Sequence, residues 1–586
     1  MNYPIWELPA PGLLIAAVAI VHVFISHFAV GGGLFLVLGE RKARAEGDEA
    51  LLGFVRTLSR FFILLTLVFG ALTGVGIWFT IGLVHPQATS ALVTAFVWAW
   101  AIEWTFFAVE IAAAMVYYYG WDRLDPRTHM RVGWVYFVSA WASLAVISGI
   151  LSFMATSGEW VVTRSFADGF FNPTFWPTVA VRTAVAVGLA GLYAVLAASF
   201  LSDVELKARV VRWSTTRWVA PAAVFIPVTL VWYLSAAAGA GTPVAETLGA
   251  PGPGVGELLA AVLSPSSPAG HPIVRQAALV TLAGATLLVL GALGVAALRA
   301  RTYGRLEGAV LMLLGFLSMG ASEWVREGLR KPWVIDRHMF VNAVRLPASA
   351  GGPIVDDPFT VDTLGERGVL ATARFARVPE GYRPGLPGFD ELEPSIRAAV
   401  EARAGREVFR LECAACHTER GHLGVRPLVE GRGVAALETL LDSLARPVTT
   451  TGEPTAWSNP RVRVETRLGR RMPPFVGTAA EKRALAIHLA RLGGDPDAGV
   501  AASVGGDAGV QAFETHCAAC HGPGTPWPMA DRQGGRSREE FYDLIGRLAE
   551  VREEMPPFSG TEGERAALAE HLAGIPAAAP NEEVTS

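Results

Sequence analysis

The chain has 586 residues, of which 52% are hydrophobic and 17% are charged. This composition is too apolar for a single soluble fold, and the length allows several domains, so we expect a membrane-embedded part and a soluble part. The formal net charge of −4 provides no basic field, which excludes nucleic acid as an expected partner.

The N-terminal segment, MNYPIWELPAPGLLIAAVAIVHVF, lacks the basic region and the small-residue cleavage site of a removable signal peptide. We therefore expect it to be retained as a first membrane span. Apolar runs of about 20 residues, the length that crosses the hydrocarbon core of a bilayer, recur up to residue 335. They predict an all-α bundle of eight spans: 11–38, 60–84, 91–118, 131–155, 175–200, 217–238, 273–298 and 306–325.

The loops that connect these spans alternate between basic loops and loops with almost no Lys or Arg. Loops 85–90 and 239–272 contain no Lys or Arg, and loop 156–174 contains only Arg164. The other four loops are basic, with Arg41, Lys42, Arg44, Arg56, Arg123, Arg127, Lys207, Arg209, Arg212, Arg299, Arg301 and Arg305. The positive-inside rule places these four loops in the cytoplasm. After eight spans the chain is back outside the cytoplasm, so we expect a multi-pass protein of the bacterial inner membrane with a periplasmic tail.

Ionisable residues inside the predicted spans are functional candidates, because each costs about 3 kcal/mol at the bilayer centre on insertion scales. The first span holds His22 and His27, and the third holds Glu103 and Glu110, which are seven residues apart and share a helical face. His22 and Glu103 fall at similar depths, about 15 to 18 Å from the outer ends. We expect them to meet at one cofactor, although a membrane histidine can also be a packing residue. Glu110 lies deeper, where a proton route needs an acid.

A second group of charges lies at the outer ends of the fifth, seventh and eighth spans, against the charge bias of the loops. This group is cationic and consists of Arg182, Arg275, Arg326, Arg330 and Lys331. Anionic partners are needed there, and haem propionates would supply them. Snorkelling to lipid phosphates is the alternative.

Four stretches in this part of the chain, AIVHVFISHFAVGGG, AIEWTFFAVE, YYYGWDRLDPRTHM and EGLRKPW, resemble subunit I of cytochrome bd-type terminal oxidases in content and order. The resemblance extends over about residues 10–335. It implies that His22 is the ligand of a high-spin haem, and that Glu103 and Glu110 are the acidic pair for haem ligation and proton delivery. Arg330 and Trp333 match a segment of that family at the end of the bundle.

The chain also departs from the family pattern. Arg182 and Ala277 occupy the positions of the family's low-spin haem ligands, and neither side chain binds iron. A family glutamate ligand falls on Gly320, with Glu323 one helical turn away as its replacement. The outer loop that binds quinol is replaced by 239–272, and the family's ninth helix is missing. These losses affect the input of electrons from quinol, whereas the ligands of the deeper centre remain.

The polar tail contains an internal duplication. GREVFRLECAACH at 405–417 matches GVQAFETHCAACH at 509–521, and RMPPFVGTAAEKRALAIHLA at 471–490 matches EMPPFSGTEGERAALAEHLA at 554–573. Each copy predicts a helix before C-A-A-C-H and an amphipathic helix after M-P-P-F. The expected domains are the bundle (1–335), a linker (336–394), two small α-helical domains (395–495 and 507–577) and a short tail (578–586).

The C-x-x-C-H motif is typical of covalent haem attachment, which takes place on the export side of a bacterial membrane. Cys413 with Cys416, and Cys517 with Cys520, would bond one haem each. The copies resemble class I cytochrome c domains, which implies the axial pairs His417 with Met472 and His521 with Met555. Zinc binding and a redox C-x-x-C are the alternatives, and His488 and His571 are rival sixth ligands.

The leading hypothesis is a bd-like terminal oxidase subunit that takes electrons from a soluble or membrane-bound cytochrome c through two c haems. One or two non-covalent haems, of b or d type, would reduce oxygen in the membrane, with nitric oxide as an alternative acceptor. A second multi-helix subunit is implied by the family. Two other hypotheses are a quinol:cytochrome c oxidoreductase with outward electron flow and a membrane-anchored dihaem carrier.

Overall fold

The protein is described from a computed structural model. The described residues are 3, 6, 11–240, 272–347, 357–378, 385, 387–389, 391–448, 463–466, 472–499, 508–522, 529, 535–551, 555 and 557–575. The chain forms two compact units, the first mainly Gly12–Phe340 and the second mainly Val355–Ser586. Each unit is described by itself below.

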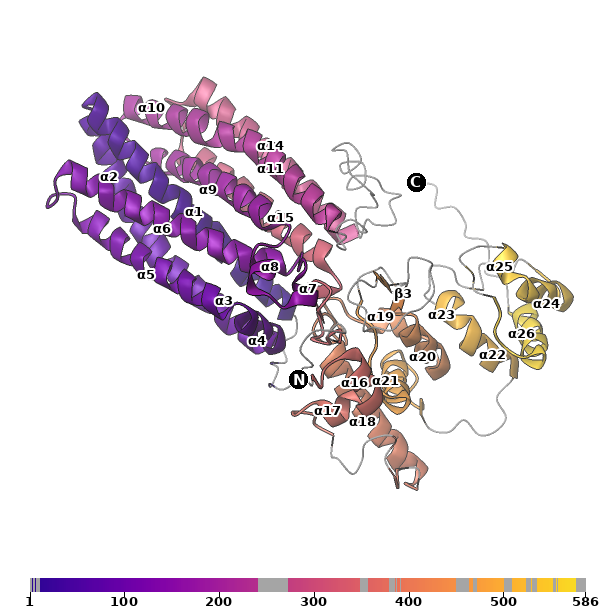
Figure 1. The fold of residues 1–586 in the computed structure, drawn as a ribbon. Helices are drawn as coiled ribbons and strands as arrows, with labels where there is room; N and C mark the ends of the chain where they lie inside the picture. Colours follow the sequence, from indigo (N-terminus) through magenta and orange to yellow (C-terminus); the bar gives the residue numbers. More distant parts are fainter. Residues whose placement is uncertain are drawn as a thin grey trace. The chain divides into compact units, whose positions relative to one another are not determined.

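The first unit is a bundle of long apolar helices (Figure 1). Eight helices among the described residues are long and apolar enough to cross a membrane, which confirms the predicted number of spans. They are built from α1 (Pro11–Glu46), α2 (Glu49–Ile63), η1 (Leu64–Gly70), α3 (Ala71–Val84), α5 (Val97–Tyr119), α6 (Pro126–Phe153), α9 (Phe175–Ala198), α10 (Val204–Ser214), η2 (Thr215–Val219), α11 (Ala220–Gly239), α14 (Pro272–Gly294), η3 (Val295–Arg299) and α15 (Arg305–Arg330).

Several helices continue beyond their predicted apolar limits. Most of segments 39–59 and 201–216, which the sequence predicts as loops, is helical. Asp48 and Asp203 start the new turns, since their carboxylates accept hydrogen bonds from Leu51 N (2.9 Å) and Leu206 N (3.0 Å). The polar ends of α1, α2 and α10 therefore pack as helices instead of crossing solvent as loops.

The predicted third span is interrupted at its outer end. A short helix, α4 (Pro86–Ala95), is followed by Phe96 in a non-helical conformation, and α5 begins at Val97. Phe96 is fully buried and packs edge-on against Phe153 at 4.8 Å between ring centroids. Two further short helices, α7 (Trp160–Thr163) and α8 (Phe166–Phe170), lie in the same region. Aromatic packing thus overrides the apolar run that predicted one continuous helix.

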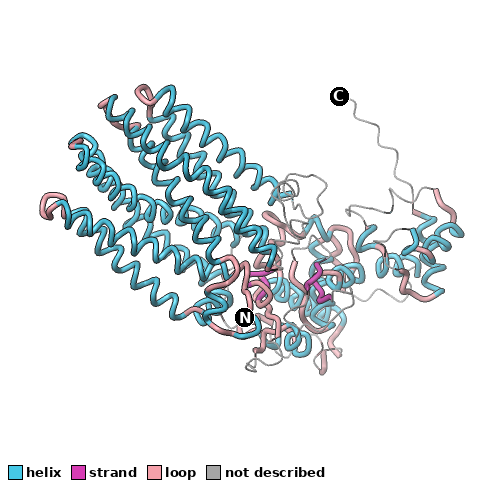
Figure 2. The backbone as a smooth tube through the Cα atoms, turned by 45° about the horizontal axis from the view of Figure 1, so that its top comes forward, coloured by secondary structure: helices cyan, strands magenta, loops and turns pink. Residues whose placement is uncertain are grey.

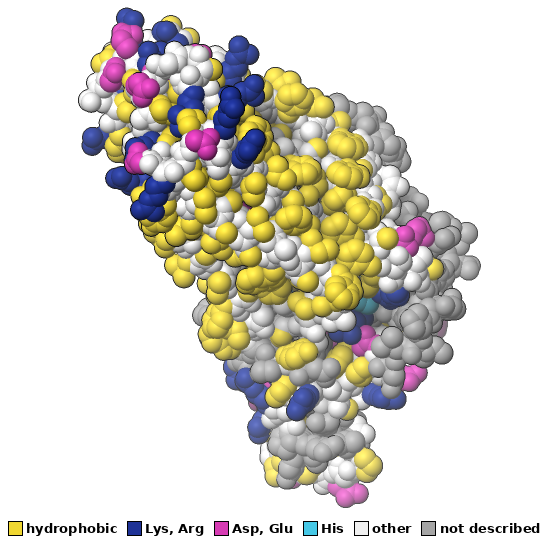
Figure 3. All heavy atoms as spheres, turned by 60° about the vertical axis from the view of Figure 1, so that its left-hand side comes forward, with side chains coloured by type: hydrophobic (Ala, Val, Ile, Leu, Met, Phe, Trp, Pro, Cys, Tyr) yellow, Lys and Arg dark blue, Asp and Glu magenta, His cyan; other side chains and the backbone are white. Residues whose placement is uncertain are grey.

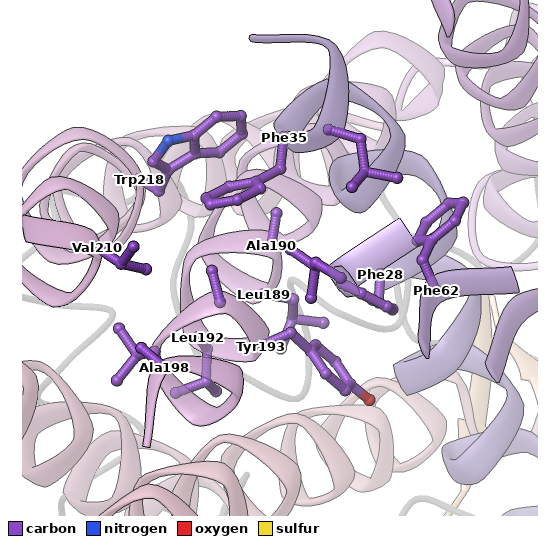
Figure 4. Close-up of a cluster of buried hydrophobic side chains, with 14 of the residues drawn as sticks. Phe28, Phe35, Phe62, Leu189, Ala190, Leu192, Tyr193, Ala198, Val210 and Trp218 are labelled. Atoms are coloured by element: carbon purple, nitrogen blue, oxygen red, sulfur yellow. The ribbon is translucent and has the colours of Figure 1, made fainter. Parts of the chain in front are cut away.

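The core of the bundle lies between α1 and α9. Gly31 allows the two backbones to touch, because a Cβ atom there would lie 1.9 Å from the carbonyl oxygen of Ala186. Phe28 stacks on Tyr193 at 3.9 Å between ring centroids, and Phe35 packs against Trp218 at 4.9 Å (Figure 4). The Gly-Gly-Gly stretch of the first span therefore serves close helix packing.

The outer surface of the bundle carries a broad apolar area, and Lys and Arg side chains gather at one end of it (Figure 3). Large hydrophobic side chains such as Trp98 and Val75 are 73% and 67% exposed. Such exposure would be unfavourable in water and is expected for side chains that face lipid. The first unit is accordingly a multi-pass membrane bundle.

The second unit is helical as well, with short strands (Figure 2). Its elements are α16 (Val361–Arg367), α17 (Val369–Thr372), α18 (Pro394–Glu412), α19 (Arg426–Val429), α20 (Val434–Asp442), β3 (Ala445–Val448), β4 (Arg463–Thr466), α21 (Ala479–Leu492), α22 (Ala508–His516), α23 (Ala518–His521), α24 (Arg538–Gly546), α25 (Leu548–Val551) and α26 (Glu562–Gly574). The strands β3 and β4 pair antiparallel. The hairpin β1 (Trp333–Ile335) and β2 (Met339–Phe340) belongs to the first unit.

The duplication of the tail is visible in its packing. In each copy the helix before C-A-A-C-H packs against the last helix, α18 against α21 and α22 against α26. Both last helices begin with a capping box, Thr478 with Glu481 and Thr561 with Glu564. The predicted order of elements in each copy is confirmed by these helices.

Part of the segment expected to be a linker is packed onto the first copy. Glu481 of α21 accepts hydrogen bonds from Val369 N (3.0 Å) and Leu370 N (2.8 Å), the first residues of α17. Glu407 of α18 accepts another from Arg377 N at 2.9 Å. These buried carboxylates fix the chain before α18 to the first tail domain.

Candidate functional site

The first C-A-A-C-H segment forms a compact turn at the end of α18. Cys413 N donates to Phe409 O at 2.8 Å, and His417 N donates to Cys413 O at 2.9 Å, so the chain makes a hydrogen-bonded turn through the motif directly after α18. Cys413 and Cys416 are free thiols. This single turn therefore presents both sulfurs and the histidine from adjacent positions, as thioether attachment of a haem requires.

The ring of His417 is oriented by the backbone. Its Nδ1 lies 2.9 Å from the carbonyl oxygen of Leu423, which can only accept a hydrogen bond. Nδ1 must therefore carry the proton, and Nε2 keeps its lone pair. A histidine held in this way is typical of metal ligands, whose second nitrogen is commonly bonded to a carbonyl or carboxylate. The donor set of the first copy fits a c-type haem.

The second copy repeats this backbone geometry. Cys517 N donates to Phe513 O at 2.8 Å, and His521 N donates to Cys517 O at 2.8 Å. The side chain of Cys520 lies outside the described residues. Met472 and Met555, the predicted sixth ligands, are both half-buried and precede α21 and α26. The same pattern of ligand types occurs in both copies.

The rival histidines have equivalent packing positions. His488 of α21 lies 5.8 Å from the ring of Phe409, and His571 of α26 lies 5.5 Å from the ring of Phe513. Nε2 of His488 is also 3.5 Å from a carboxylate oxygen of Glu419, and burial lowers the pKa of this histidine. These contacts give the two histidines a role in helix packing, which favours the methionines as sixth ligands.

Zinc gains no support from the part of the chain that the structure describes. No three His, Cys, Asp or Glu side chains there come together as a metal-binding group.

Both histidines of α1 have hydrogen-bonded Nδ1 atoms. His22 Nδ1 lies 3.1 Å from the hydroxyl of Thr73, which itself donates to Phe69 O at 2.7 Å. With the hydroxyl proton on Phe69 O, Nδ1 of His22 is the donor and Nε2 has the free lone pair. His27 Nδ1 lies 2.7 Å from Val23 O, and the same argument holds. Both rings thus have the tautomer that an Nε2 iron ligand needs.

Glu103 and Glu110 are bonded to α6. Ser143 donates to Glu103 Oε1 at 3.0 Å, and the Tyr136 hydroxyl lies 3.0 Å from Glu110 Oε1. Glu103 is half-buried and Glu110 is buried. His22 instead bonds to Thr73 of α3, so the structure gives the two expected partners of one iron different neighbours. Their joint ligation of a haem stays a prediction.

The arginines of α15 have anionic partners within their own helix. Arg326 pairs with Glu323 at 2.8 Å and with Glu327 at 3.2 Å. Arg330 pairs with Glu327 and also donates to Val334 O at 2.7 Å. Neutralisation of these cations, which the sequence assigned to haem propionates or lipid, is provided here by protein carboxylates. Glu323 as an iron ligand would have to give up its bond to Arg326.

The remaining predicted residues of this region are placed as follows. Arg182 of α9 is close enough to Glu323 and Arg326 of α15 to be attracted by the first charge and repelled by the second. Trp333 stacks on Phe340 at 4.1 Å between ring centroids. The side chain of Arg275 lies outside the described residues, and Ala277 lies in α14.

The sequence interpretation missed a buried polar cluster at the ends of α1, α5 and α6. Glu40 and His129 are 0% and 1% exposed, and His129 Nδ1 lies 2.8 Å from Glu40 Oε2. The Tyr117 hydroxyl donates to the same oxygen at 2.9 Å, and Arg44 Nε donates to Oε1 at 2.8 Å. Glu40 and His129 both fall outside the predicted spans, where composition predicts loops.

A membrane bundle joined to paired C-A-A-C-H domains defines a membrane-bound haem oxidoreductase. Residues 13–247 match the family model of cytochrome bd terminal oxidase subunit I, and residues 505–572 match that of the cbb3-type cytochrome c oxidase subunit III. The chain is thus similar to cytochrome bd oxidase subunit I over residues 13–247 and to a cbb3-type cytochrome c subunit over residues 505–572, which confirms the resemblance in these two segments.

One solved structure similar to this chain is the bd oxidase from Geobacillus thermodenitrificans. It is 14% identical, with a TM-score of 0.47, over 56% of this chain and 89% of that chain. No curated protein matches the chain significantly.

Proposed function

We propose that this chain is the haem-bearing membrane subunit of a bd-like respiratory oxidase that takes electrons from a c-type donor and reduces oxygen. The observation that carries the proposal is the repeated arrangement of a helix, C-A-A-C-H, M-P-P-F and a second helix, attached to a bd-like bundle. A protein with this arrangement would have c-type electron carriers and the membrane centre in one chain.

Two covalent c haems would carry single electrons, and one or two non-covalent b or d haems in the bundle would bind and reduce oxygen. Cys413 and Cys416 hold the first c haem, and Cys517 and Cys520 hold the second. The axial ligands are proposed to be His417 with Met472 and His521 with Met555. The hydrogen bond from His417 Nδ1 to the backbone oxygen of Leu423 orients the first of these imidazoles before a haem is bound.

In the bundle, the proposed roles follow the chemistry of each side chain. His22 offers a neutral Nε2 to iron, and Glu103 offers a carboxylate or passes a proton. Glu110 holds a proton next to Tyr136. Arg330, Arg182, Arg275 and Trp333 are proposed to border a cofactor at the outer side, and Glu323 is the candidate for a further iron ligand.

The proposed donor is cytochrome c, since the usual route from quinol is altered at three places. Arg182 and Ala277 stand where the family has the ligands of its low-spin haem, and segment 239–272 replaces the charged quinol loop. These changes leave the c haems as the remaining electron input.

The proposed topology places both c domains in the periplasm. The basic ends of the helices mark the cytoplasmic side. The N-terminus then lies on the opposite side, and an even number of spans returns the chain to that side. A soluble or membrane-bound cytochrome c would reach the c domains there, and a second multi-helix subunit is the proposed membrane partner.

Steady-state oxygen uptake with reduced cytochrome c and with quinol, measured on the purified complex, tests the proposal. We expect turnover with cytochrome c and little with quinol. Reduction of cytochrome c by quinol would instead identify a quinol:cytochrome c oxidoreductase. Reducible c haems with no membrane haem spectrum would identify an anchored electron carrier. Parallel assays with nitric oxide identify the oxidant.

A further inference from the structure

Helix α20 of the first c domain also packs against the second copy. Besides α21 of its own copy, it contacts α22 and α23, the helices that flank Cys517. Thr439 Oγ1 of α20 donates to the Thr515 carbonyl oxygen at 3.0 Å. Arg432, just before α20, donates from Nη1 to the carbonyl oxygen of Ala518 at 3.3 Å. Since Ala518 lies inside the second C-A-A-C-H, the first domain is bonded to the segment that would hold the second haem.

The contact is close at the start of α20. Arg432 is buried, with 9% of its surface exposed. A buried guanidinium group is costly unless its donors are bonded, so its place against the second copy indicates an ordered contact. At the next residue, Gly433, a Cβ atom would lie 2.7 Å from the carboxylate of Glu514 in α22. The absence of a side chain at this position lets α20 approach α22.

The second copy contains the equivalent of α20, which allows an internal comparison. Helix α24 begins as many residues after its C-A-A-C-H as α20 does, and a glycine with positive φ precedes each helix, Gly431 (70°) and Gly535 (69°). An arginine follows this glycine in both copies, Arg432 and Arg536. Arg432 is buried, whereas Arg536 is exposed. The two copies therefore share the local fold and differ in how this face is covered.

The side chains of this face differ between the copies as a buried contact requires. Three small or uncharged residues of α20 stand where α24 has exposed carboxylates: Ala435 for Glu539, Ala436 for Glu540 and Thr439 for Asp543. Their spacing of three and four residues puts them on one face of the helix. Carboxylates at these positions would have to lose water when the second copy packs on them, which is unfavourable. The face of α20 is thus suited to a contact for which the face of α24 is not.

We propose that this face of α20 holds the attachment segment of the second c domain, so that the two c domains form one fixed dihaem unit. One electron then passes from the ferrous iron of one c haem to the ferric iron of the other without a movement of either domain. The inference deepens the proposed function and rests on it, because it concerns how electrons from the donor cross the two c domains. The competing explanation is a contact that only stabilises the fold of the tail.

The test uses the full-length, haem-loaded chain. The double variant Arg432→Gln with Thr439→Asp removes both hydrogen bonds and places a carboxylate beside the Thr515 carbonyl oxygen. The double variant Arg536→Gln with Asp543→Thr is the matched control, because it makes the corresponding changes at exposed positions of the second copy. Thr439→Asp alone is a milder variant, since Thr439 is half-buried and its replacement leaves the core of the first domain intact. Covalent haem content should be the same in all of them.

Hydrogen exchange followed by mass spectrometry measures the docking. Peptides from residues 508–522 should exchange faster in both α20 variants, on the order of tenfold in the double variant, because two hydrogen bonds to this segment are lost. The control should keep wild-type protection there. Peptides from α18 and α21 should keep wild-type protection in all variants, which shows that the first domain is still folded.

Electron equilibration between the c haems measures the function of the contact. Pulse radiolysis of the oxidised chain places one electron on a c haem, and optical spectra follow its distribution between the two. The α20 variants should lose the fast equilibration that the wild type and the control show, because the rate of electron tunnelling decreases exponentially with distance.

Two results would overturn the inference. Wild-type hydrogen exchange in both α20 variants would show that α20 does not hold the second domain. Faster exchange with unchanged electron equilibration would leave the contact a structural role only. Neither measurement needs oxygen or quinol, so oxygen uptake by the wild type with reduced cytochrome c decides the proposed function separately.

Discussion

Gly405 of α18 and Ala484 of α21 lie where the two helix backbones touch, and a Cβ atom at Gly405 would be 1.9 Å from the Ala484 carbonyl oxygen. The second tail domain has the same relationship, because a Cβ atom at Gly509 would be 2.3 Å from the Ala567 carbonyl oxygen. The glycine of the shared G-x3-F-x3-C-A-A-C-H pattern thus sets the distance between the helix that carries the motif and the last helix of each domain.

A substitution at this crossing should destabilise its domain. Gly509→Ala must push α22 away from α26, and we expect it to lower the free energy of unfolding by about 1 to 3 kcal/mol. Gly563→Ala in α26 is the control, since a Cβ atom at Gly563 would have no atom within 4 Å, and helix propensity should make it neutral or stabilising by up to about 1 kcal/mol. Thermal unfolding of the haem-loaded protein measures both. Equal stability of the two variants would contradict the close crossing.

The attachment motifs predict two covalent haems per chain. Denatured protein should retain both, and the double variant Cys413→Ser and Cys416→Ser should retain one, because the second copy has its own thiols. Mass spectrometry and haem staining after denaturation measure the number. Zinc in place of covalent haem in the wild type would show that the interpretation of the motifs is wrong.

The two histidines of α1 should differ in their effect on the membrane pigment. We expect His22→Ala to remove or convert one non-covalent haem and to leave both c haems, since His22 holds the family's ligand position. Optical spectra of the purified protein distinguish the two kinds of haem. His27→Ala is the paired control, and loss of pigment in that variant alone would assign the ligand to His27.

Turnover with reduced cytochrome c should depend on the two methionines that are proposed as haem ligands. Met472→Ala or Met555→Ala should abolish turnover with reduced cytochrome c, because loss of the thioether lowers the potential of a c haem. Oxygen consumption with each donor is the measurement, and redox titration of the c haems checks the cause. Robust quinol oxidation by a variant that lacks both cysteine pairs would falsify the proposed flow of electrons from the c haems into the membrane.

The membrane spans and the tail domains could be predicted because their signals are local. Twenty-residue apolar runs and two copies of C-A-A-C-H need no knowledge of the folded chain. The limits of the helices were harder to predict, because carboxylates such as Asp48 and Asp203 cap polar turns that composition alone assigns to loops.

The polar contacts inside the bundle could not be predicted from spacing alone. Equal depth suggested that His22 and Glu103 meet, yet depth leaves the rotation of each helix undetermined, and the two side chains bond to α3 and α6. Glu40 and His129 are 89 residues apart in the chain. Their contact depends on how α1 packs against α6, which no local pattern records.

The hydrogen bonds of Ser143 to Glu103 and of Tyr136 to Glu110 join positions that are seven residues apart on both α5 and α6. This spacing constrains the length of the two helices. One inserted or deleted residue would rotate everything beyond it by about 100° around the helix axis. A deletion between Glu103 and Glu110 would therefore turn one of them away from α6, although all the hydrogen-bonding side chains would still be present. Relatives of this chain that keep these two hydrogen-bonded pairs should accordingly tolerate substitutions between Glu103 and Glu110, but no insertions or deletions.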